Sequence, residues 1–269
     1  MPSFLQRYAA FALDLDGVIW RGEHIIEGAK EGVDAIRAAG KPLLFLSNNA
    51  AYLPSWVIDR LRSAGIDVTD REVLTSGMVL QGWIRSHGLA GKRALVLGVP
   101  EVVQQVAEVA DVVPFDRPDG VAMVVAARDT AFDYERLRVA ADAIRAGARF
   151  VAVNRDPTLP LPGGRLDPGT GAIVAAVETA SGARATILGK PERPTMEAAA
   201  EIVGREGVLM IGDRADSDVA GARTIGWDAA LVLTGVTAAG DDVDPVPDYV
   251  IESLPALAAE TEGCRVGAQ

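Results

Sequence analysis

The stretch FALDLDGVIW, residues 11–20, is an apolar run broken by two carboxylates one residue apart, Asp14 and Asp16. Acidic side chains are seldom buried without a partner, so a buried strand that ends on two of them needs a reason. On its own the pair has three explanations: a solvated strand end, a metal-binding turn, or a pair of catalytic acids. The rest of the sequence has to decide among them.

Short apolar runs of this kind recur along the chain, and segments of helical period lie between most of them. After the first run, Ala29, Val33 and Ile36 form one face of a helix. Continuous Val-, Leu- and Ile-rich runs that alternate with helices predict a parallel sheet covered on both faces, which is the doubly wound α/β class. The predicted strands are residues 8–14, 42–49, 93–98, 121–127, 149–154, 185–190, 208–213 and 229–235.

Two weak boundary signals divide the chain, the TSG at 75–77 and the turn-rich stretch 154–171. They favour a smaller α/β unit inserted into a larger core, and the alternative is one continuous large sheet. The expected division is a core of residues 1–78 and 187–260, an inserted unit of residues 79–186 and a tail of residues 261–269.

The composition is that of a globular protein, with 269 residues, 49% of them hydrophobic and 23% charged. A formal net charge of −11 argues against non-specific nucleic-acid binding, which depends on lysine and arginine. No apolar run approaches the roughly 18 residues of a membrane helix. The N-terminal residues do not resemble a secretory signal, and we expect a cytoplasmic protein. The single cysteine, Cys264, is a poor candidate for a nucleophile.

Ligands of open α/β sheets bind outside the carboxyl ends of the strands, and polar groups follow four of the predicted strands. Each group alone has an ordinary explanation as a turn, a helix cap or a surface lysine. Their joint occurrence at strand ends favours phosphate and metal chemistry. Other runs, such as residues 229–235, end without such groups. The four groups are Asp14 with Asp16; Ser47 with Asn48 and Asn49; Lys190; and Asp213 with Asp216 and Asp218.

The segments DLDGV, LSNN, GKP and GDRADSD, in that order, resemble the four motifs of the haloacid-dehalogenase-like hydrolase superfamily. The inserted unit and the stretch DPTLPLPGGRLDPGTGAIVAA are similar to its NagD or 4-nitrophenylphosphatase-like subfamily, which includes pyridoxal, phosphoglycolate and glycerol-3-phosphate phosphatases. The resemblance covers about residues 8–250. It implies a phosphatase with a Rossmann-like core and a cap unit that selects the substrate.

The resemblance implies that Asp14 is the nucleophile and forms an aspartyl-phosphate. A carboxylate is ionised at neutral pH, so we expect Asp14 to need no base. Asp16 is implied as the general acid and then the general base. Halide-releasing relatives lack this acid, so an aspartate here indicates phosphate transfer to water. Ser47 and the backbone amide of Asn48, expected near a helix start, would bind the phosphoryl group together with Lys190.

The resemblance also implies a metal site of Asp14, the backbone carbonyl of Asp16, Asp213 and Asp218, with Asp218 holding a metal-bound water. Four acids and Lys190 give a charge of about −3, and like charges about 4 Å apart repel by on the order of 4 kcal/mol. A phosphate dianion therefore requires a cation there, and oxygen ligands favour Mg²⁺.

The cap loop at 154–171 is implied to read the leaving group, with Asn154 and Asp156 in substrate binding alongside Asn49. Its alternative is a plain proline-rich connection. Pyridoxal-phosphatase-like members tend to carry an aromatic residue and a histidine where this chain has Thr158 and Leu159. We therefore favour glycerol 3-phosphate or phosphoglycolate as substrate, with 4-nitrophenyl phosphate as an artificial one, over pyridoxal phosphate or a nucleotide.

Other functions remain open at this point. A phosphotransferase or mutase would use the same motifs with a different acceptor. A phospho-aspartate receiver module is about half this length and orders its acids differently, and a dehydrogenase would need a GxGxxG after the first strand. Relatives often dimerise through the cap, so a homodimer is one expectation. Trp20 is a candidate lid over the site, and His24 a candidate substrate contact.

Overall fold

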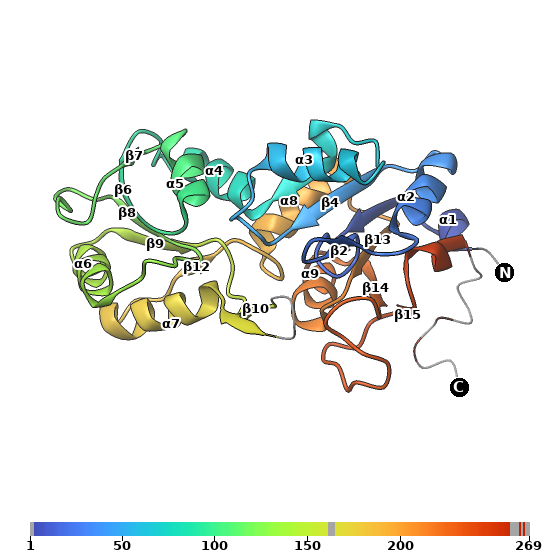
Figure 1. Cartoon of the computed structure of the whole chain (residues 1–269). Helices are drawn as coiled ribbons and strands as arrows, with labels where there is room; N and C mark the ends of the chain where they lie inside the picture. The colour runs from blue at the N-terminus through green and yellow to red at the C-terminus, as the bar shows by residue number, and fades with distance from the viewer. Residues whose placement is uncertain (1–2, 161–164, 259–263, 265, 267–269) are drawn as a thin grey trace. The chain divides into compact units, whose positions relative to one another are not determined.

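The computed structural model describes residues 3–160, 165–258, 264 and 266, and the chain divides into two compact units (Figure 1). The tail expected at 261–269 lies almost entirely outside the described residues. The first unit comprises Met1–Ser47, Pro54–Leu74 and Lys190–Gln269, and the second unit comprises Asn48–Leu53 and Thr75–Gly189.

The first unit is built on a six-stranded sheet of order β15-β14-β13-β1-β4-β5. Strand β1 pairs in parallel with β13 and β4, and β14 pairs in parallel with β13 and β15. The strands are β1 (Ala10–Leu13), β4 (Leu43–Ser47), β5 (Val73–Thr75), β13 (Val208–Gly212), β14 (Asp228–Val232) and β15 (Tyr249–Ile251).

The central strand β1 shows why these apolar runs are continuous. All four of its residues are buried, and Phe11 lies opposite Leu43 on one neighbour and Leu209 on the other. A parallel strand in the middle of a sheet that is covered on both faces has no solvent side, so its side chains do not alternate between apolar and polar.

Short helices and one hairpin complete the first unit. Helix α2 buries Ala29, Val33 and Ile36, the face that the sequence predicts. The elements are α1 (Phe4–Arg7), α2 (Ala29–Ala38), α3 (Pro54–Ser63), α8 (Arg193–Val203), α9 (Ala220–Ile225), the hairpin β2 (Trp20–Arg21) and β3 (His24–Ile25), the 3₁₀ helices Asp70–Glu72 and Leu254–Ala258, and the π-helical turn Ala215–Val219.

The second unit has its own sheet, of order β12-β9-β8-β6-β7, in which all four neighbouring pairs are parallel. The parallel α/β fold class is therefore confirmed in both units. The elements are α4 (Ser76–Ser86), β6 (Arg93–Leu97), α5 (Pro100–Ala107), β7 (Asp111–Val112), β8 (Met123–Ala126), α6 (Tyr134–Arg145), β9 (Arg149–Ala152), β10 (Thr158–Pro160), β11 (Leu166–Pro168), α7 (Thr170–Ser181) and β12 (Thr186–Ile187).

Two segments differ from the sequence-based expectation. The stretch 154–171 holds a short antiparallel hairpin of β10 and β11 rather than turns alone. The strand expected at 185–190 contains only Thr186–Ile187, and it pairs with β9 at the edge of the second sheet. Lys190 therefore does not follow a strand of the first unit's sheet; the first unit resumes at Lys190 itself.

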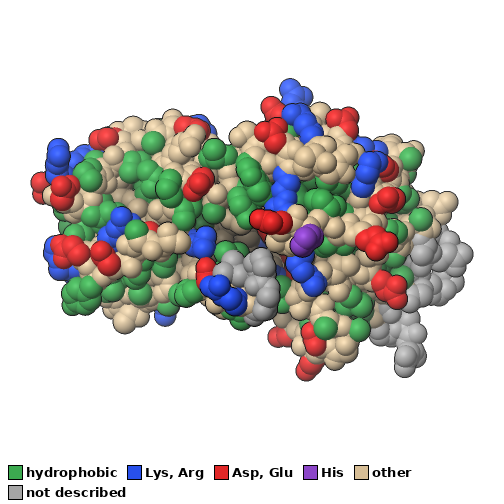
Figure 2. Space-filling model, viewed as in Figure 1, with side chains coloured by type: hydrophobic (Ala, Val, Ile, Leu, Met, Phe, Trp, Pro, Cys, Tyr) green, Lys and Arg blue, Asp and Glu red, His purple; other side chains and the backbone are tan. Residues whose placement is uncertain are grey.

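The distribution of charged side chains and the length of the helices are relevant to binding of nucleic acid and of membranes. Acidic and basic side chains are interspersed over the face shown in Figure 2. Within the described part of the chain, no helix combines the length and the apolar character that a membrane crossing requires.

Candidate active site

The end of β1 places Asp14 in the interior of the first unit. The backbone N–H of Asp14 donates to the carbonyl of Ile211 at 2.8 Å, which continues the β1–β13 pairing, and Asp14 is 8% exposed. Gly17 follows with φ +85°, and a Cβ there would lie 2.2 Å from Asp213 Oδ2. Only glycine allows both this backbone conformation and this close approach to a carboxylate.

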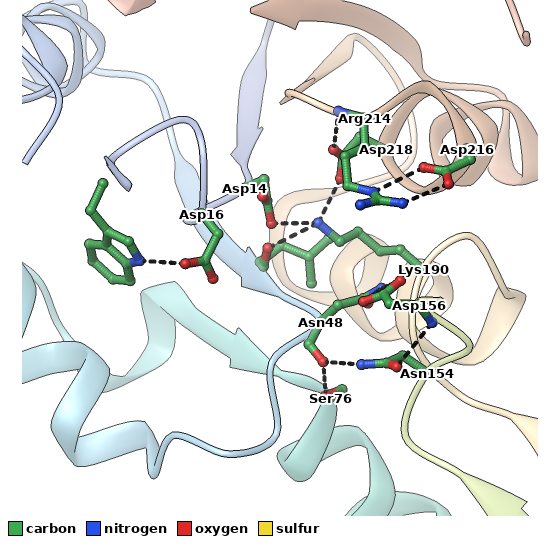
Figure 3. Close-up of polar contacts among 12 residues, drawn as sticks. Asp14, Asp16, Asn48, Ser76, Asn154, Asp156, Lys190, Arg214, Asp216 and Asp218 are labelled. Atoms are coloured by element: carbon green, nitrogen blue, oxygen red, sulfur yellow. Dashed lines mark hydrogen bonds and ion pairs between the residues drawn. The ribbon is translucent and has the colours of Figure 1, made fainter. Parts of the chain in front are cut away.

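Lys190 is a buried cation between two carboxylates. Its Nζ donates to Asp14 Oδ1 and to Asp218 Oδ1, each at 2.7 Å, and the side chain is 2% exposed (Figure 3). A third bond, at 3.3 Å, goes to the backbone carbonyl of Leu46 in β4. The three N–H donors of the ammonium are thus matched by two charged acceptors and one neutral acceptor.

Asp213 follows β13 and is held by a loop after β14. The backbone N–H of Val236 donates to Asp213 Oδ2 at 2.6 Å, and Thr237 Oγ1 donates to the Asp213 carbonyl at 2.7 Å. Gly235 approaches so closely that a Cβ on it would lie 1.9 Å from Asp213 Oδ2. The same loop reaches the end of β1, where Thr234 Oγ1 donates to the carbonyl of Gly17 at 2.6 Å.

Asp14, Asp213 and Asp218 form a buried group of carboxylates. One oxygen of each lies within 4.8 Å of the others, a spacing that suits a shared cation. Carboxylate oxygens are hard ligands of the kind that bind Mg²⁺ or Ca²⁺. The charges fit as well, because Lys190 offsets only one of three buried carboxylates.

The pKa values record this shortage of positive charge. Burial raises the pKa of Asp14 well above its ordinary value; Lys190 opposes the shift, and the charges of Asp218, Asp213 and Asp16 add to it. Burial and the charge of Asp218 raise the pKa of Asp213 to about 7. Burial lowers the pKa of Lys190, but Asp14 and Asp218 outweigh burial and keep that pKa above its ordinary value.

These shifts change the expectation that Asp14 is ionised without help. Burial is the main effect that disfavours the charged form of its carboxyl group, and the charges of three nearby acids add to it. The ammonium of Lys190, 2.7 Å away, stabilises the charged form, and a bound cation would do so further.

Asp16 has a different environment from Asp14, two residues away. Its side chain is exposed, and its Oδ1 accepts a hydrogen bond from Trp20 Nε1 at 3.0 Å. The crowding of protein around it raises the pKa of Asp16, while Trp20, Arg60 and Lys190 act in the opposite direction. A raised pKa is what a general acid requires. Trp20 itself is fully buried.

Ser47 and Asn48 are neighbours in the chain that belong to different units. Ser47 ends β4 in the first unit and is 3% exposed. Asn48 begins the 48–53 segment, which is bound to the second unit: Ser76 Oγ and Asn154 Nδ2 both donate to the Asn48 carbonyl, at 2.7 and 2.8 Å (Figure 3).

Asn48 lies near the start of α4, whose first residue, Ser76, donates to its carbonyl, and not near the start of the helix that follows it in the chain. The next helix, α3, begins only at Pro54, and the intervening residues form a turn in which Asn49 Oδ1 accepts from the backbone N–H of Ala51 at 2.9 Å.

Asn154 and Asp156 lie in the second unit, on the segment that follows β9. The N–H of Asp156 donates to Asn154 Oδ1 at 3.2 Å, and Asn48 Nδ2 approaches Asp156 Oδ1 at 3.4 Å. Asn48, Asn154 and Asp156 thus form one hydrogen-bonded group. Their roles in substrate binding, like that of Asn49, stay predictions.

Comparison with known proteins identifies the family. Residues 11–110 match the family model of haloacid dehalogenase-like hydrolases, and residues 187–257 match that of HAD-hydrolase-like proteins. The acid sugar phosphatase of Staphylococcus aureus is 33% identical over 262 residues, which span 96% of this chain and 100% of that protein. The chain belongs to the haloacid dehalogenase-like hydrolase family.

Solved structures of haloacid dehalogenase-like phosphatases share the fold. The glycerol phosphate phosphatase of Mycobacterium tuberculosis in complex with magnesium has a TM-score of 0.86 at 33% identity, over 100% of this chain and 82% of that one. The p-nitrophenyl phosphatase of Archaeoglobus fulgidus has a TM-score of 0.86 at 28% identity, over 93% and 98%. The chain is a phosphatase of this family, of the 4-nitrophenylphosphatase-like type, and so a phosphoric monoester hydrolase.

The sequence missed several residues around the haloacid dehalogenase-like site. The run at 229–235 was expected to end without functional groups, but it leads into the loop of Thr234, Val236 and Thr237 that holds Asp213. Two threonines and a glycine directly after a strand were the available signal. The spacing of residues in the sequence did not indicate the ion pair of Lys190 with Asp218 or the hydrogen bond from the Trp20 indole to Asp16.

Proposed function

We propose that the protein hydrolyses small-molecule phosphate monoesters in a Mg²⁺-dependent reaction with Asp14 as nucleophile. One observation carries the proposal: Asp14, Asp213 and Asp218 share a buried cluster in which Lys190 is ion-paired with Asp14 and Asp218. Such a cluster is costly for folding alone, and a site for a cation and a phosphate explains it.

In the first proposed step, a carboxylate oxygen of Asp14 attacks phosphorus and the bond from phosphorus to the ester oxygen breaks. Asp16 gives its proton to that oxygen, and the alcohol leaves. Lys190 holds the reacting carboxylate of Asp14 through a bond of 2.7 Å and offsets charge that the phosphoryl oxygens bring.

In the second proposed step, Asp16, now ionised, takes a proton from water. The water oxygen attacks phosphorus, the Asp14–phosphorus bond breaks, and inorganic phosphate is released with Asp14 restored. The exposure of the Asp16 side chain supports this role, because the proton acceptor must meet water. Ser47, at the end of β4, is proposed to donate its hydroxyl to the phosphoryl oxygens.

Asp14, Asp213 and Asp218 would hold the Mg²⁺ ion, together with the backbone carbonyl of Asp16 that the sequence predicts. When bound, the ion supplies positive charge that lowers the repulsion between the carboxylates and the phosphate dianion. An all-oxygen ligand set supports Mg²⁺ over zinc. The M. tuberculosis protein, 33% identical, is described in complex with magnesium.

The proposed substrate is glycerol 3-phosphate or phosphoglycolate, and the second unit is proposed to select it through Asn154 and Asp156. The name of the M. tuberculosis protein, a glycerol phosphate phosphatase, supports the first. The S. aureus relative is named an acid sugar phosphatase, so sugar phosphates are the second candidate class.

Initial rates with Mg²⁺ on a panel of phosphate monoesters test this proposal. The panel holds glycerol 3-phosphate, phosphoglycolate, a hexose phosphate, pyridoxal 5′-phosphate, a nucleoside monophosphate and 4-nitrophenyl phosphate. We expect phosphate release without an added acceptor, with the small polyol or acid phosphate highest in kcat/KM. A tenfold preference for pyridoxal 5′-phosphate or the nucleotide would refute the substrate class, and turnover only with a sugar acceptor would make the protein a phosphotransferase.

A further inference from the structure

Trp20 lies four residues after Asp16 and presents its indole N–H to that carboxylate. The distance from Nε1 to Asp16 Oδ1 is 3.0 Å (Figure 3). The two side chains differ sharply in environment, because Asp16 is exposed whereas Trp20 has 0% of its surface exposed. An exposed carboxylate that would otherwise sample several rotamers is thus bonded to a donor in the protein interior.

The position of the indole is fixed by groups other than Asp16. The guanidinium of Arg60 lies 4.4 Å from the Trp20 ring centroid and 5.1 Å from that of Trp56, and the two indole rings meet edge to face at 6.3 Å. Arg60 also donates to the carbonyl of Gly22, in the turn of the β2–β3 hairpin. Helix α3 therefore holds both the ring and the hairpin that carries it.

The backbone closes the turn between the two side chains. The N–H of Gly17 donates to the Trp20 carbonyl at 2.7 Å, and the N–H of Trp20 donates to the Leu15 carbonyl at 3.1 Å. The side chains of Asp16 and Trp20 therefore project from the same tight, hydrogen-bonded turn, which fixes the distance between their backbones.

This geometry distinguishes the two oxygens of Asp16. An indole N–H can only donate, so Oδ1 is an acceptor in every protonation state of Asp16. When Asp16 carries a proton, this bond favours the proton on Oδ2, because a carbonyl-type oxygen accepts better than a hydroxyl oxygen. Trp20 thereby selects the oxygen that gives up the proton and limits rotation of the carboxyl group.

We propose that Trp20 is a positioning residue that orients Asp16 for proton transfer to the leaving oxygen. The inference rests on the proposed role of Asp16 as general acid and adds a second residue to it. Trp20 acts through Asp16 and is assigned no contact with the substrate.

The effect of Trp20 should depend on the leaving group. 4-Nitrophenolate is a stable anion that departs without a proton, whereas an alkoxide such as that of glycerol needs one. A loss of folded protein or of cation binding lowers both reactions equally. The ratio of kcat/KM for the two esters, measured on one preparation, therefore cancels the fraction of active enzyme and reports proton transfer to the leaving group.

The experiment compares Trp20→Phe with the wild type on 4-nitrophenyl phosphate and on the best alkyl phosphate of the panel. We expect kcat/KM for the alkyl ester to fall at least about tenfold more than for the nitrophenyl ester, because small displacements of a catalytic group cost rates of this order. Asp16→Asn should shift the same ratio further, by about 10²-fold or more. In the Asp16→Asn background, Trp20→Phe should shift it no further.

Trp227→Phe is the matched control. Trp227 is another buried indole of the first unit, 2% exposed, and its Nε1 donates to the Arg205 carbonyl at 3.1 Å. Its loss removes one buried indole hydrogen bond without touching Asp16, and the ratio should stay within about twofold of the wild type. If Trp20→Phe does not fold, β-(3-benzothienyl)alanine at position 20 replaces the N–H by sulfur at nearly unchanged shape.

The outcomes separate the two proposals. If Asp16→Asn shifts the ratio and neither variant at position 20 does, the positioning role of Trp20 is overturned and the proposed function stands. If Asp16→Asn leaves the ratio unchanged, the general-acid role fails and the inference fails with it. If Trp20→Phe and Trp227→Phe shift the ratio equally, the indole is structural only.

Discussion

Two groups of charged side chains around buried carboxylates, one in each unit, have opposite charge balance. In the first unit, three carboxylates lie close together, and one cation, Lys190, is paired with two of them, Asp14 and Asp218. In the second unit, one carboxylate, Glu178, receives two arginines: Arg155 Nη2 lies 2.6 Å from Oε1 and Arg184 Nη1 lies 2.9 Å from Oε2. The backbone N–H of Ala185 adds a bond to Oε1 at 3.0 Å.

The pKa values follow that balance. The hydrogen bond from Arg155 is the largest influence that lowers the pKa of Glu178 to about 2, whereas burial and Asp218 raise the pKa of Asp213 to about 7. A carboxylate with more positive than negative neighbours stabilises the fold. Carboxylates with too few positive neighbours destabilise the fold until a cation or ligand binds. This property indicates that the carboxylates of the first unit form the functional site.

The largest expected effect comes from Asp14, in the cluster of the first unit where three carboxylates have too little positive charge near them. Asp14→Asn keeps shape and volume but removes the nucleophile, and we expect hydrolysis of 4-nitrophenyl phosphate to fall by at least about 10³-fold. Circular dichroism should show the fold unchanged. Retention of a tenth of the activity would contradict the assignment, and Asp216→Asn, at an exposed acid paired with Arg214, is the matched control.

Removal of the cation should have the next largest effect. Chelation should abolish activity, and Mg²⁺ should restore it. Because a proton on Asp213 competes with the ion and its pKa is about 7, the affinity for Mg²⁺ measured by calorimetry should weaken as the pH falls through about 7. An affinity that stays constant between pH 8 and pH 6 would contradict the assignment of Asp213 as a ligand.

Neutralising an acid of the same cluster should stabilise the metal-free protein. The pKa of Asp213 is raised in the folded state, so its ionisation lowers stability progressively from about pH 4, and the full penalty is present above about pH 7. At pH 8, Asp213→Asn should raise the free energy of unfolding by about 1–3 kcal/mol in the presence of a chelator. Added Mg²⁺ should raise the melting temperature of the wild type more than that of the variant. A destabilised metal-free variant would contradict this account.

The same kind of substitution in the second unit should have the opposite sign and a smaller size. Glu178→Gln leaves Arg155 and Arg184 without their charge partner, and we expect a loss of only about 1–2 kcal/mol, since both arginines are exposed and screened by solvent. The folded-state pKa is lowered, so the contribution is fully present above the ordinary glutamate pKa of about 4.3 and disappears as the pH falls to about 2.

Denaturant titrations at pH 7 and pH 3 measure this difference. Glu135→Gln, which removes an exposed carboxylate paired with Arg138, is the control and should cost less than about 0.5 kcal/mol. A Glu178→Gln variant as stable as the wild type at pH 7 would show that the second cluster adds nothing to stability.

The fold could be predicted from the sequence wherever a single continuous apolar run corresponds to a single strand. The continuous run ending at Leu13 predicted a buried parallel strand, and Val33 and Ile36 predicted the buried face of α2. Spacing could not tell which sheet Thr186–Ile187 joins, because two residues at a sheet edge carry no pairing signal. The β10–β11 hairpin was hidden because its prolines and glycines are also typical of irregular loops.

The site was predictable for side chains that lie at strand ends, such as Asp14 and Asp213. It was not predictable where the partner is a backbone group or comes from a distant turn, as with the N–H of Val236 on Asp213. The raised pKa of Asp14 was not predictable for the same reason: the sequence contains four acids but does not give their burial or their distances from Lys190.

We propose that Asp14 carries the phosphoryl group during turnover, and a rapid-quench experiment tests this most directly. Enzyme with Mg²⁺ and an excess of the preferred substrate is quenched in acid within one turnover, and its peptides are weighed by mass spectrometry. We expect one added HPO₃ on the peptide that contains Asp14, absent from the Asp14→Asn variant. Turnover with the added group on another residue, such as Ser47, would contradict it.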